Sequence, residues 1–223
     1  MIIREFDVEF TSPVCICDIE ICNNIKDANG NWNWEKSDIV TFGTLYGNNI
    51  RILQREKKDE LNNWKNALVR EIENKPLMFS FNNKMERLGI KGFLGINQLY
   101  EEIQPACGSG MSKDNIFDDL VKKRIVLSEN IPKDPFNKNS LLVVESYQKG
   151  DYESIIGHNK SCLIKEYFIF MNRFWFLKQY GKFLKNGWWY GKQPFSKGEP
   201  EVQEEVDDSD GMVFNSSPRS PYP

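Results

Sequence analysis

The sequence predicts an α/β fold in which helices flank a mixed β-sheet. Three β-rich stretches come first, a helix and a further strand follow over residues 59–81, and helical patterns fill most of the chain from there to residue 184. A strand–helix–strand connection implies a right-handed crossover between parallel strands, whereas strands joined by short turns pair antiparallel. We therefore expect the first three strands to be antiparallel and the next one to be parallel.

The first three predicted strands are residues 13–22, 38–46 and 49–53. The first, PVCICDIEIC, is apolar on both faces apart from two acids, which is typical of a central strand. The second is rich in β-branched and aromatic residues, and Gly47-Asn48-Asn49 predicts a turn before the third.

Residues 59–74 predict a helix, because large apolar side chains recur at helical spacing. These side chains are Leu61, Trp64, Leu68 and Ile72. Residues 76–81 are short and apolar and predict a strand. The segment after residue 81 begins as a helix, which we expect to break at its glycines.

The second half of the chain predicts three more helices, over residues 115–127, 139–150 and 151–184. The last is long and amphipathic. Asp151 is a good N-cap for it, and Gly181 is a good stop.

Residues 1–190 are expected to form one domain, and residues 191–223 a disordered acidic tail. From Glu199 onward the chain has seven acids and one base, which leaves 28 basic and 25 acidic residues, a net +3, in residues 1–198. A mildly basic domain is compatible with a nucleic-acid substrate. We expect the tail to be a solvated tether. The alternatives are that it competes with nucleic acid for the basic groove or docks a protein partner.

No apolar run approaches the ~18 residues that a membrane helix needs. Charges also interrupt the N-terminal MIIREFDVEF, where a signal peptide is apolar. We therefore expect a soluble, cytoplasmic protein without a membrane partner. The cysteines at 15, 17, 22, 107 and 162 follow no zinc-type spacing, and packing as reduced, small apolar side chains is the simplest interpretation.

Asp18 and Glu20 are two residues apart in the first strand, so their carboxylates share one face of the sheet. Two ionised carboxylates at the end of a central strand are costly unless a partner neutralises them. A divalent cation with a preference for oxygen ligands, Mg²⁺ or Mn²⁺, would do so. The alternative is that the strand ends by residue 18 and both acids are solvated. This stretch alone leaves both open.

Two further stretches carry polar side chains suited to the same site. His158, the one histidine of the chain, lies in line with Cys162 and Glu166 on successive helical turns. Asn82 and Glu86 follow the strand at 76–81, at the edge where open α/β sheets bind ligands. A structural histidine and a capped surface helix remain the alternatives.

In this order, the three stretches resemble the DEDD exonuclease superfamily of the ribonuclease H-like fold, and most nearly the YprB-type ribonuclease H-like predicted exonucleases. The family's first motif, Asp-x-Glu, matches Asp18-Ile19-Glu20. Its second matches Phe81-Asn82 with Glu86, and its third matches His158-Asn159 with Cys162. The resemblance covers about residues 10–180, and it rests on order and spacing because each motif is weak alone.

The resemblance implies metal-dependent 3′–5′ hydrolysis of the phosphodiester bonds of DNA or RNA, at a single-stranded 3′ end, with two Mg²⁺ or Mn²⁺ ions. Asp18, Glu20 and Glu86 would be both catalytic and metal-binding. His158 would be the general base or would orient the water. By the same resemblance Asn82, Asn159 and Lys160 would contact the nucleic acid.

The chain departs from the family pattern at two positions. Glu86 replaces an aspartate but keeps the charge. Cys162 replaces the last aspartate, and a neutral thiol is a poor ligand for Mg²⁺. Glu166, one turn later on the same face, is a candidate replacement ligand. The alternative is a catalytically impaired module that keeps the fold and binds nucleic acid or a protein.

Overall fold

The computed structural model describes residues 1–23, 33, 36–75, 77–81, 83–96, 100–103, 112–127, 129, 131–173, 181–183 and 189–191. Its elements in chain order are β1 (Ile2–Ile21), β2 (Ile39–Gln54), α1 (Leu61–Glu73), β3 (Met78–Ser80), α2 (Asn83–Leu94), β4 (Tyr100–Glu102), α3 (Lys113–Lys122), α4 (Leu142–Lys149), α5 (Tyr152–Met171), β5 (Gly181–Phe183) and β6 (Trp189–Gly191).

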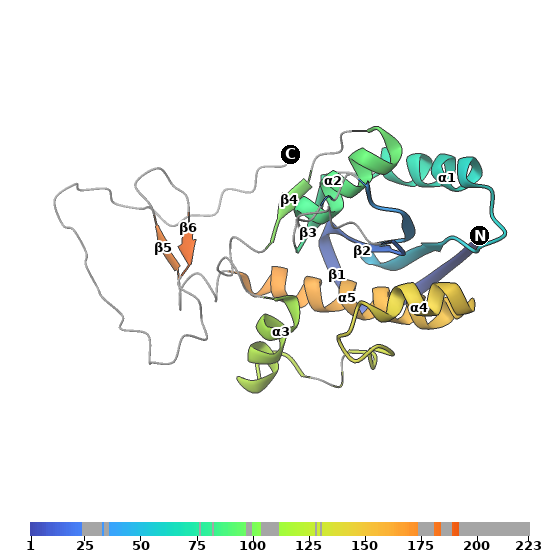
Figure 1. The fold of residues 1–223 in the computed structure, drawn as a ribbon. Helices are drawn as coiled ribbons and strands as arrows, with labels where there is room; N and C mark the ends of the chain where they lie inside the picture. The colour runs from blue at the N-terminus through green and yellow to red at the C-terminus, as the bar shows by residue number, and fades with distance from the viewer. Residues whose placement is uncertain are drawn as a thin grey trace, which may run out of the picture.

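Four strands form a mixed sheet in the order β2-β1-β3-β4. β1 pairs antiparallel with β2 and parallel with β3, and β3 pairs parallel with β4. The connection from β2 through α1 to β3 therefore leads into the parallel part of the sheet, as predicted. The two strands that it joins run antiparallel to each other, so it is not the expected crossover between parallel strands. This sheet and its helices confirm the α/β class (Figure 1).

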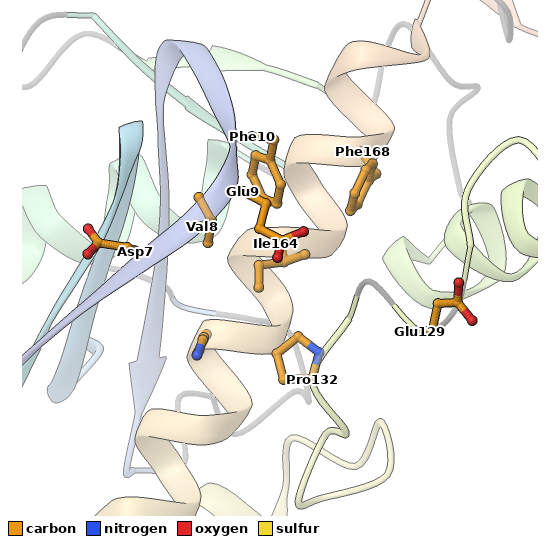
Figure 2. A pocket seen from close by; sticks show the side chains of 9 residues that line it. Asp7, Val8, Glu9, Phe10, Glu129, Pro132, Ile164 and Phe168 are labelled. Atoms are coloured by element: carbon orange, nitrogen blue, oxygen red, sulfur yellow. The ribbon is translucent and has the colours of Figure 1, made fainter.

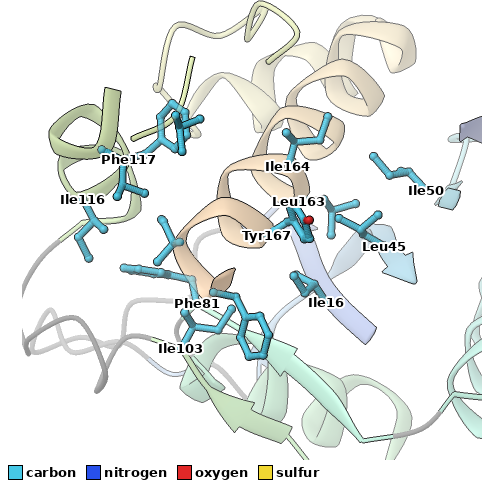
Figure 3. Close-up of a cluster of buried hydrophobic side chains, with 14 of the residues drawn as sticks. Ile16, Leu45, Ile50, Phe81, Ile103, Ile116, Phe117, Leu163, Ile164 and Tyr167 are labelled. Atoms are coloured by element: carbon cyan, nitrogen blue, oxygen red, sulfur yellow. The ribbon is translucent and has the colours of Figure 1, made fainter. Parts of the chain in front are cut away.

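Helices cover both faces of the sheet, with α1 and α2 on one side and α4 and α5 on the other (Figure 1). Successive side chains of β1 point alternately to these two sides of the sheet, as the sequence predicts. Cys17 and Ile19 pack with Trp64 of α1, whereas Ile16 packs with Leu163 of α5 (Figure 3). Asp18 and Glu20 share the face of Ile16 and therefore point toward α5.

The prediction of three antiparallel strands is wrong in one respect. Residues 49–53 form no third strand but continue β2, because β1 begins at Ile2 and its first residues pair with residues 49–54. The expected turn at Gly47 is a bend with a positive φ of 61°, at which the register against Ser12 shifts. Because Ile2–Asp7 is available to pair with residues 49–54, β2 continues as one long strand and does not turn into a separate third strand.

Two helix predictions also need correction. α2 continues through its glycines to Leu94, and Gly95 ends it with a φ of 76°. Gly89 is where α2 approaches Ile19, since an added Cβ would lie 3.2 Å from that side chain. α5 begins after Asp151 as predicted but ends at Met171, and Gly181 is the first residue of β5.

The predicted tail, residues 191–223, lies outside the described residues except for Gly191, the last residue of β6. Among the helices that the structure describes, none combines the length and apolar character that crossing a bilayer demands.

α5 lies close to the sheet because Gly43 of β2 has no side chain. A Cβ at this position would lie 1.9 Å from Asn159 Oδ1 and 2.8 Å from Leu163 Cδ1. Gly43 pairs with Asp18 of β1, so this close approach is level with the first carboxylate.

We predict that Gly43→Ala lowers the free energy of unfolding by about 1–3 kcal/mol, because the methyl group must displace Asn159 or α5. Urea denaturation measures this difference. Gly92→Ala is the matched control, since Gly92 is exposed on α2 and alanine is favoured over glycine in a helix by about 1 kcal/mol. A Gly43→Ala protein as stable as the wild type would contradict the close packing.

Candidate active site

Asp18 and Glu20 lie near the C-terminal end of β1 and are each 5 % exposed. Ile16 of β1 is level with Phe79 of the parallel strand β3, so both carboxylates project where that parallel pair ends. This is the edge at which open α/β sheets bind ligands.

α5 brings three further side chains to the same place. His158, Cys162 and Glu166 follow each other at four-residue intervals and are all buried. With Asp18 and Glu20 they line one pocket of ≈ 200 Å³. α2 contributes Glu86 and α3 contributes Lys113 to the lining. The pocket therefore contains every described residue predicted to be catalytic or metal-binding.

Lys113 neutralises two of these carboxylates. Its Nζ donates to Asp18 Oδ1 at 3.0 Å and to Glu166 Oε1 at 2.8 Å. Phe81, directly after β3, donates its backbone N–H to Glu166 Oε2 at 3.2 Å. Glu166 thus faces Asp18, as a replacement ligand would have to.

Burial shifts the pKa values of these side chains. Burial raises the pKa of Glu166 to about 8, with Lys113 opposing the rise and Asp18 adding to it. Burial would lower the pKa of Lys113, but Asp18, Cys162 and Glu166 outweigh it and raise that pKa well above its usual value. Lys113 is therefore charged, and its charge favours the ionised form of Glu166.

Glu86 is incompletely compensated. It is 3 % exposed, and its Oε2 has no hydrogen-bond partner among the described residues. Burial, and then the charges of Glu166 and Asp18, raise its pKa well above the usual range. A divalent cation would satisfy a buried carboxylate oxygen that has no hydrogen-bond donor.

His158 is held by a carboxylate from the loop before α4. Its Nδ1 lies 2.8 Å from Asp134 Oδ1, while Nε2 lies 3.8 Å from Glu20 Oε1. Burial would lower the pKa of His158, but Asp134 and Glu20 outweigh it and raise the pKa above 6.5. The Asp134 contact also makes Nδ1 the donor, so Nε2 is the atom that faces the pocket.

Asn159 is fully buried and does not line the pocket. Its Nδ2 donates to Asp18 Oδ2 at 2.8 Å and to the Asp18 carbonyl at 3.3 Å, and it lies 3.5 Å from Glu20 Oε1. The side chain predicted to contact nucleic acid therefore positions the two carboxylates of β1.

The other two predicted nucleic-acid contacts lie elsewhere. Asn82 is outside the described residues. Lys160 lines a different pocket, of ≈ 490 Å³, between the first half of β1 and α5 (Figure 2). Its Nζ lies 4.0 Å from the centre of the Phe6 ring, which is a cation–π contact.

Sequence reasoning missed Lys113 and Asp134. Lys113 is the first residue of α3, after the N-cap Ser112, whose side chain accepts the Asn115 backbone N–H. The N-cap pattern marks the helix start, but it does not identify the lysine as a partner of β1. Asp134 precedes Pro135, which signals a loop, and nothing in that signal points to His158.

The pocket offers two sets of metal ligands. Asp18, Glu20, Glu86 and Glu166 supply carboxylate oxygens, which suit Mg²⁺ or Mn²⁺, and the unpaired Glu86 Oε2 fits an additional cation. Glu20, His158 and Cys162 supply an oxygen, a nitrogen and a sulfur atom that lie within 4.8 Å of one another.

We predict that Asp134→Asn lowers the pKa of His158, measured by NMR titration of metal-free protein on the ring-proton resonances of this one histidine. Because the folded-state pKa is raised, the stabilisation by this pair is fully present below pH 6.5 and is lost as the pH rises through the folded-state pKa. Asp118→Asn, which removes an exposed acid paired with Lys138, is the control. An unchanged titration in Asp134→Asn would contradict the pairing.

We predict that Lys113→Met lowers the free energy of unfolding on the order of 3 kcal/mol, because Asp18 and Glu166 then lack their counter-charge. Mn²⁺ should raise the melting temperature of this variant more than that of the wild type, since the ion replaces the lost charge. Calorimetry with and without Mn²⁺ measures both effects. Lys122→Met, exposed on the same helix, is the control, and equal stability of the two variants would exclude a neutralising role for Lys113.

Comparison of the chain with protein-family models, with curated proteins and with solved structures finds no match.

Proposed function

We propose that the pocket is the active site of a divalent-metal-dependent nuclease that removes nucleotides from the 3′ end of single-stranded DNA or RNA. The observation that carries the proposal is the convergence of four carboxylates and one histidine from β1, α2 and α5 on a single pocket. The three motifs of the resemblance to ribonuclease H-like exonucleases supply Asp18, Glu20, Glu86 and His158, although up to 140 positions separate them in the chain. Glu166, one helical turn beyond the third motif, is the fourth carboxylate.

Two bound Mg²⁺ or Mn²⁺ ions would clamp the attacking and leaving oxygens of the phosphodiester. Asp18 and Glu20 on β1, with Glu86 and Glu166 opposite them, would hold these ions. Asn159 fixes the two β1 carboxylates through its amide group. His158 presents Nε2 to the pocket and would accept the proton of the attacking water, while Asp134 stabilises the imidazolium that forms.

The charge of the pocket supports a requirement for metal. Acids outnumber bases in its lining, where Lys113 and Lys138 are the two cationic side chains. Lys113 is already engaged by Asp18 and Glu166. Because burial raises the pKa of Glu86 and Glu166, these acids hold their protons near neutral pH unless a cation favours their ionised form. A divalent ion would also supply the positive charge that a phosphodiester anion requires, so activity should depend on such an ion.

Two observations favour the second candidate, a catalytically impaired module that binds nucleic acid or a protein partner. Cys162 takes the place of a carboxylate ligand, and the Lys113 ammonium lies between two of the remaining acids. Under this alternative the lysine permanently replaces the metal charge. The acidic segment from Glu199 onward would then be a further candidate contact for a protein partner.

We predict Mg²⁺- or Mn²⁺-dependent shortening of 5′-labelled single-stranded DNA or RNA from its 3′ end, resolved on a sequencing gel. Loss of an outer-shell partner alone costs roughly 10–100-fold in metal affinity or activity, so removing a ligand by Asp18→Ala should cost more than ~100-fold. Asp18→Asn preserves the side-chain volume and controls for misfolding. Cys162→Asp should raise the Mg²⁺-dependent rate, since it adds an oxygen ligand.

The outcomes separate the two candidates. Equal cleavage by the wild type and both Asp18 variants would indicate a contaminating nuclease and contradict the proposal. Binding without cleavage in the wild type, followed by cleavage in Cys162→Asp, would assign the chain to the impaired module.

A further inference from the structure

The residue that departs most from the nuclease pattern, Cys162, lies in a second arrangement of ligand atoms. Cys162 Sγ is 3.8 Å from His158 Nε2, one turn away on α5, and the same Nε2 is 3.8 Å from Glu20 Oε1 on β1. Neighbouring ligand atoms of a tetrahedral zinc ion with bonds of about 2.0–2.3 Å are roughly 3.3–3.6 Å apart. Two of the three pairs of ligand atoms are therefore close to the spacing of a zinc site, and the third pair, Cys162 Sγ and Glu20 Oε1, lies within 4.8 Å.

A second observation, on the other ring nitrogen of His158, points the same way. His158 Nδ1 is 2.8 Å from Asp134 Oδ1. Asp134 is itself fixed, because the backbone N–H groups of Phe136 and Lys138 donate to its carboxylate, each at 2.9 Å. Histidines that bind metals almost always donate their other ring N–H to such a carboxylate, which sets the tautomer and orients the ring.

The chemistry of the ligands selects the ion. Thiolate and imidazole ligands favour zinc-class ions, whereas Mg²⁺ requires oxygen. We propose that Glu20, His158 and Cys162 form a binding site for one Zn²⁺ ion. All three side chains line the pocket, so the fourth coordination position would be open to it. Binding forms the sulfur–zinc bond and releases the thiol proton of Cys162 to solvent.

This site does not depend on the nuclease activity proposed above, and it makes a different use of His158. A zinc ion bound to Nε2 takes up the lone pair that a general base needs. His158 therefore cannot bind zinc and accept a proton at the same time. Glu20 belongs to both proposed sets of metal ligands.

The test is titration of the full chain, reduced and freed of metal, with Co²⁺ as a spectroscopic substitute for Zn²⁺ and without any nucleic acid. We expect one Co²⁺ per chain, a thiolate-to-cobalt charge-transfer band in the near ultraviolet and the intense visible bands of a four-coordinate ion. Added Zn²⁺ should displace the cobalt. Absence of the charge-transfer band in the wild type would overturn the proposal.

Variants assign the band to these residues. Cys162→Ser should abolish it, whereas Cys22→Ser, which changes a half-buried cysteine hydrogen-bonded to Asp38, should leave it intact. Asp134→Asn leaves all three ligands in place and should weaken Zn²⁺ binding by roughly 10–100-fold. Circular dichroism confirms that each variant is folded.

A band that persists in Cys162→Ser, or unchanged zinc affinity in Asp134→Asn, would overturn the site. Because the spectrum is recorded without substrate, its result stands apart from the cleavage assay. If the protein binds cobalt and cleaves no nucleic acid, the zinc site is supported and the nuclease proposal is contradicted. If it cleaves nucleic acid and shows no cobalt site, the nuclease is supported and the zinc site is contradicted.

Discussion

The packing of α5 against β1 and β2 determines both the core and the pocket. One side of this contact is apolar, where Leu163 meets Ile16 and Leu45. The other is polar, where Asn159 reaches Asp18 across the space that Gly43 leaves open. Because the same helix supplies both contacts, the positions of the pocket residues on α5 are set by core packing and not by a loop.

Electrostatic compensation is the second constraint. Four carboxylates lie buried in one pocket, and each ionised carboxylate in such surroundings carries a large desolvation cost. Lys113 offsets part of this cost for Asp18 and Glu166, whereas Glu86 Oε2 has no hydrogen-bond partner among the described residues. A pocket built in this way favours any added positive charge, whether it comes from a metal ion or from a ligand.

The sequence predicts which side chains share a face of a strand or helix, but it does not predict which residues from other elements contact them. Alternation along a strand puts Asp18 and Glu20 on one face, and helical spacing aligns His158 with Glu166, so local geometry predicts both pairs. Lys113 lies beside Asp18 through tertiary packing across 95 residues, which no local pattern encodes. The length of β2 was missed for the same reason, since its second half exists only because the first residues of β1 are there to pair with it.

The separation between Asp18 and Asn159, 141 residues, has a consequence for how the molecule assembles. Closing a loop of that length costs conformational entropy that short-range contacts do not. Until α5 docks, Asp18 lacks its amide donor, and Glu166 and Lys113 are not yet beside it. During synthesis, β1 is complete long before the ribosome has made the helix that satisfies its carboxylates. The pocket is thus among the last parts of the domain that the growing chain can complete.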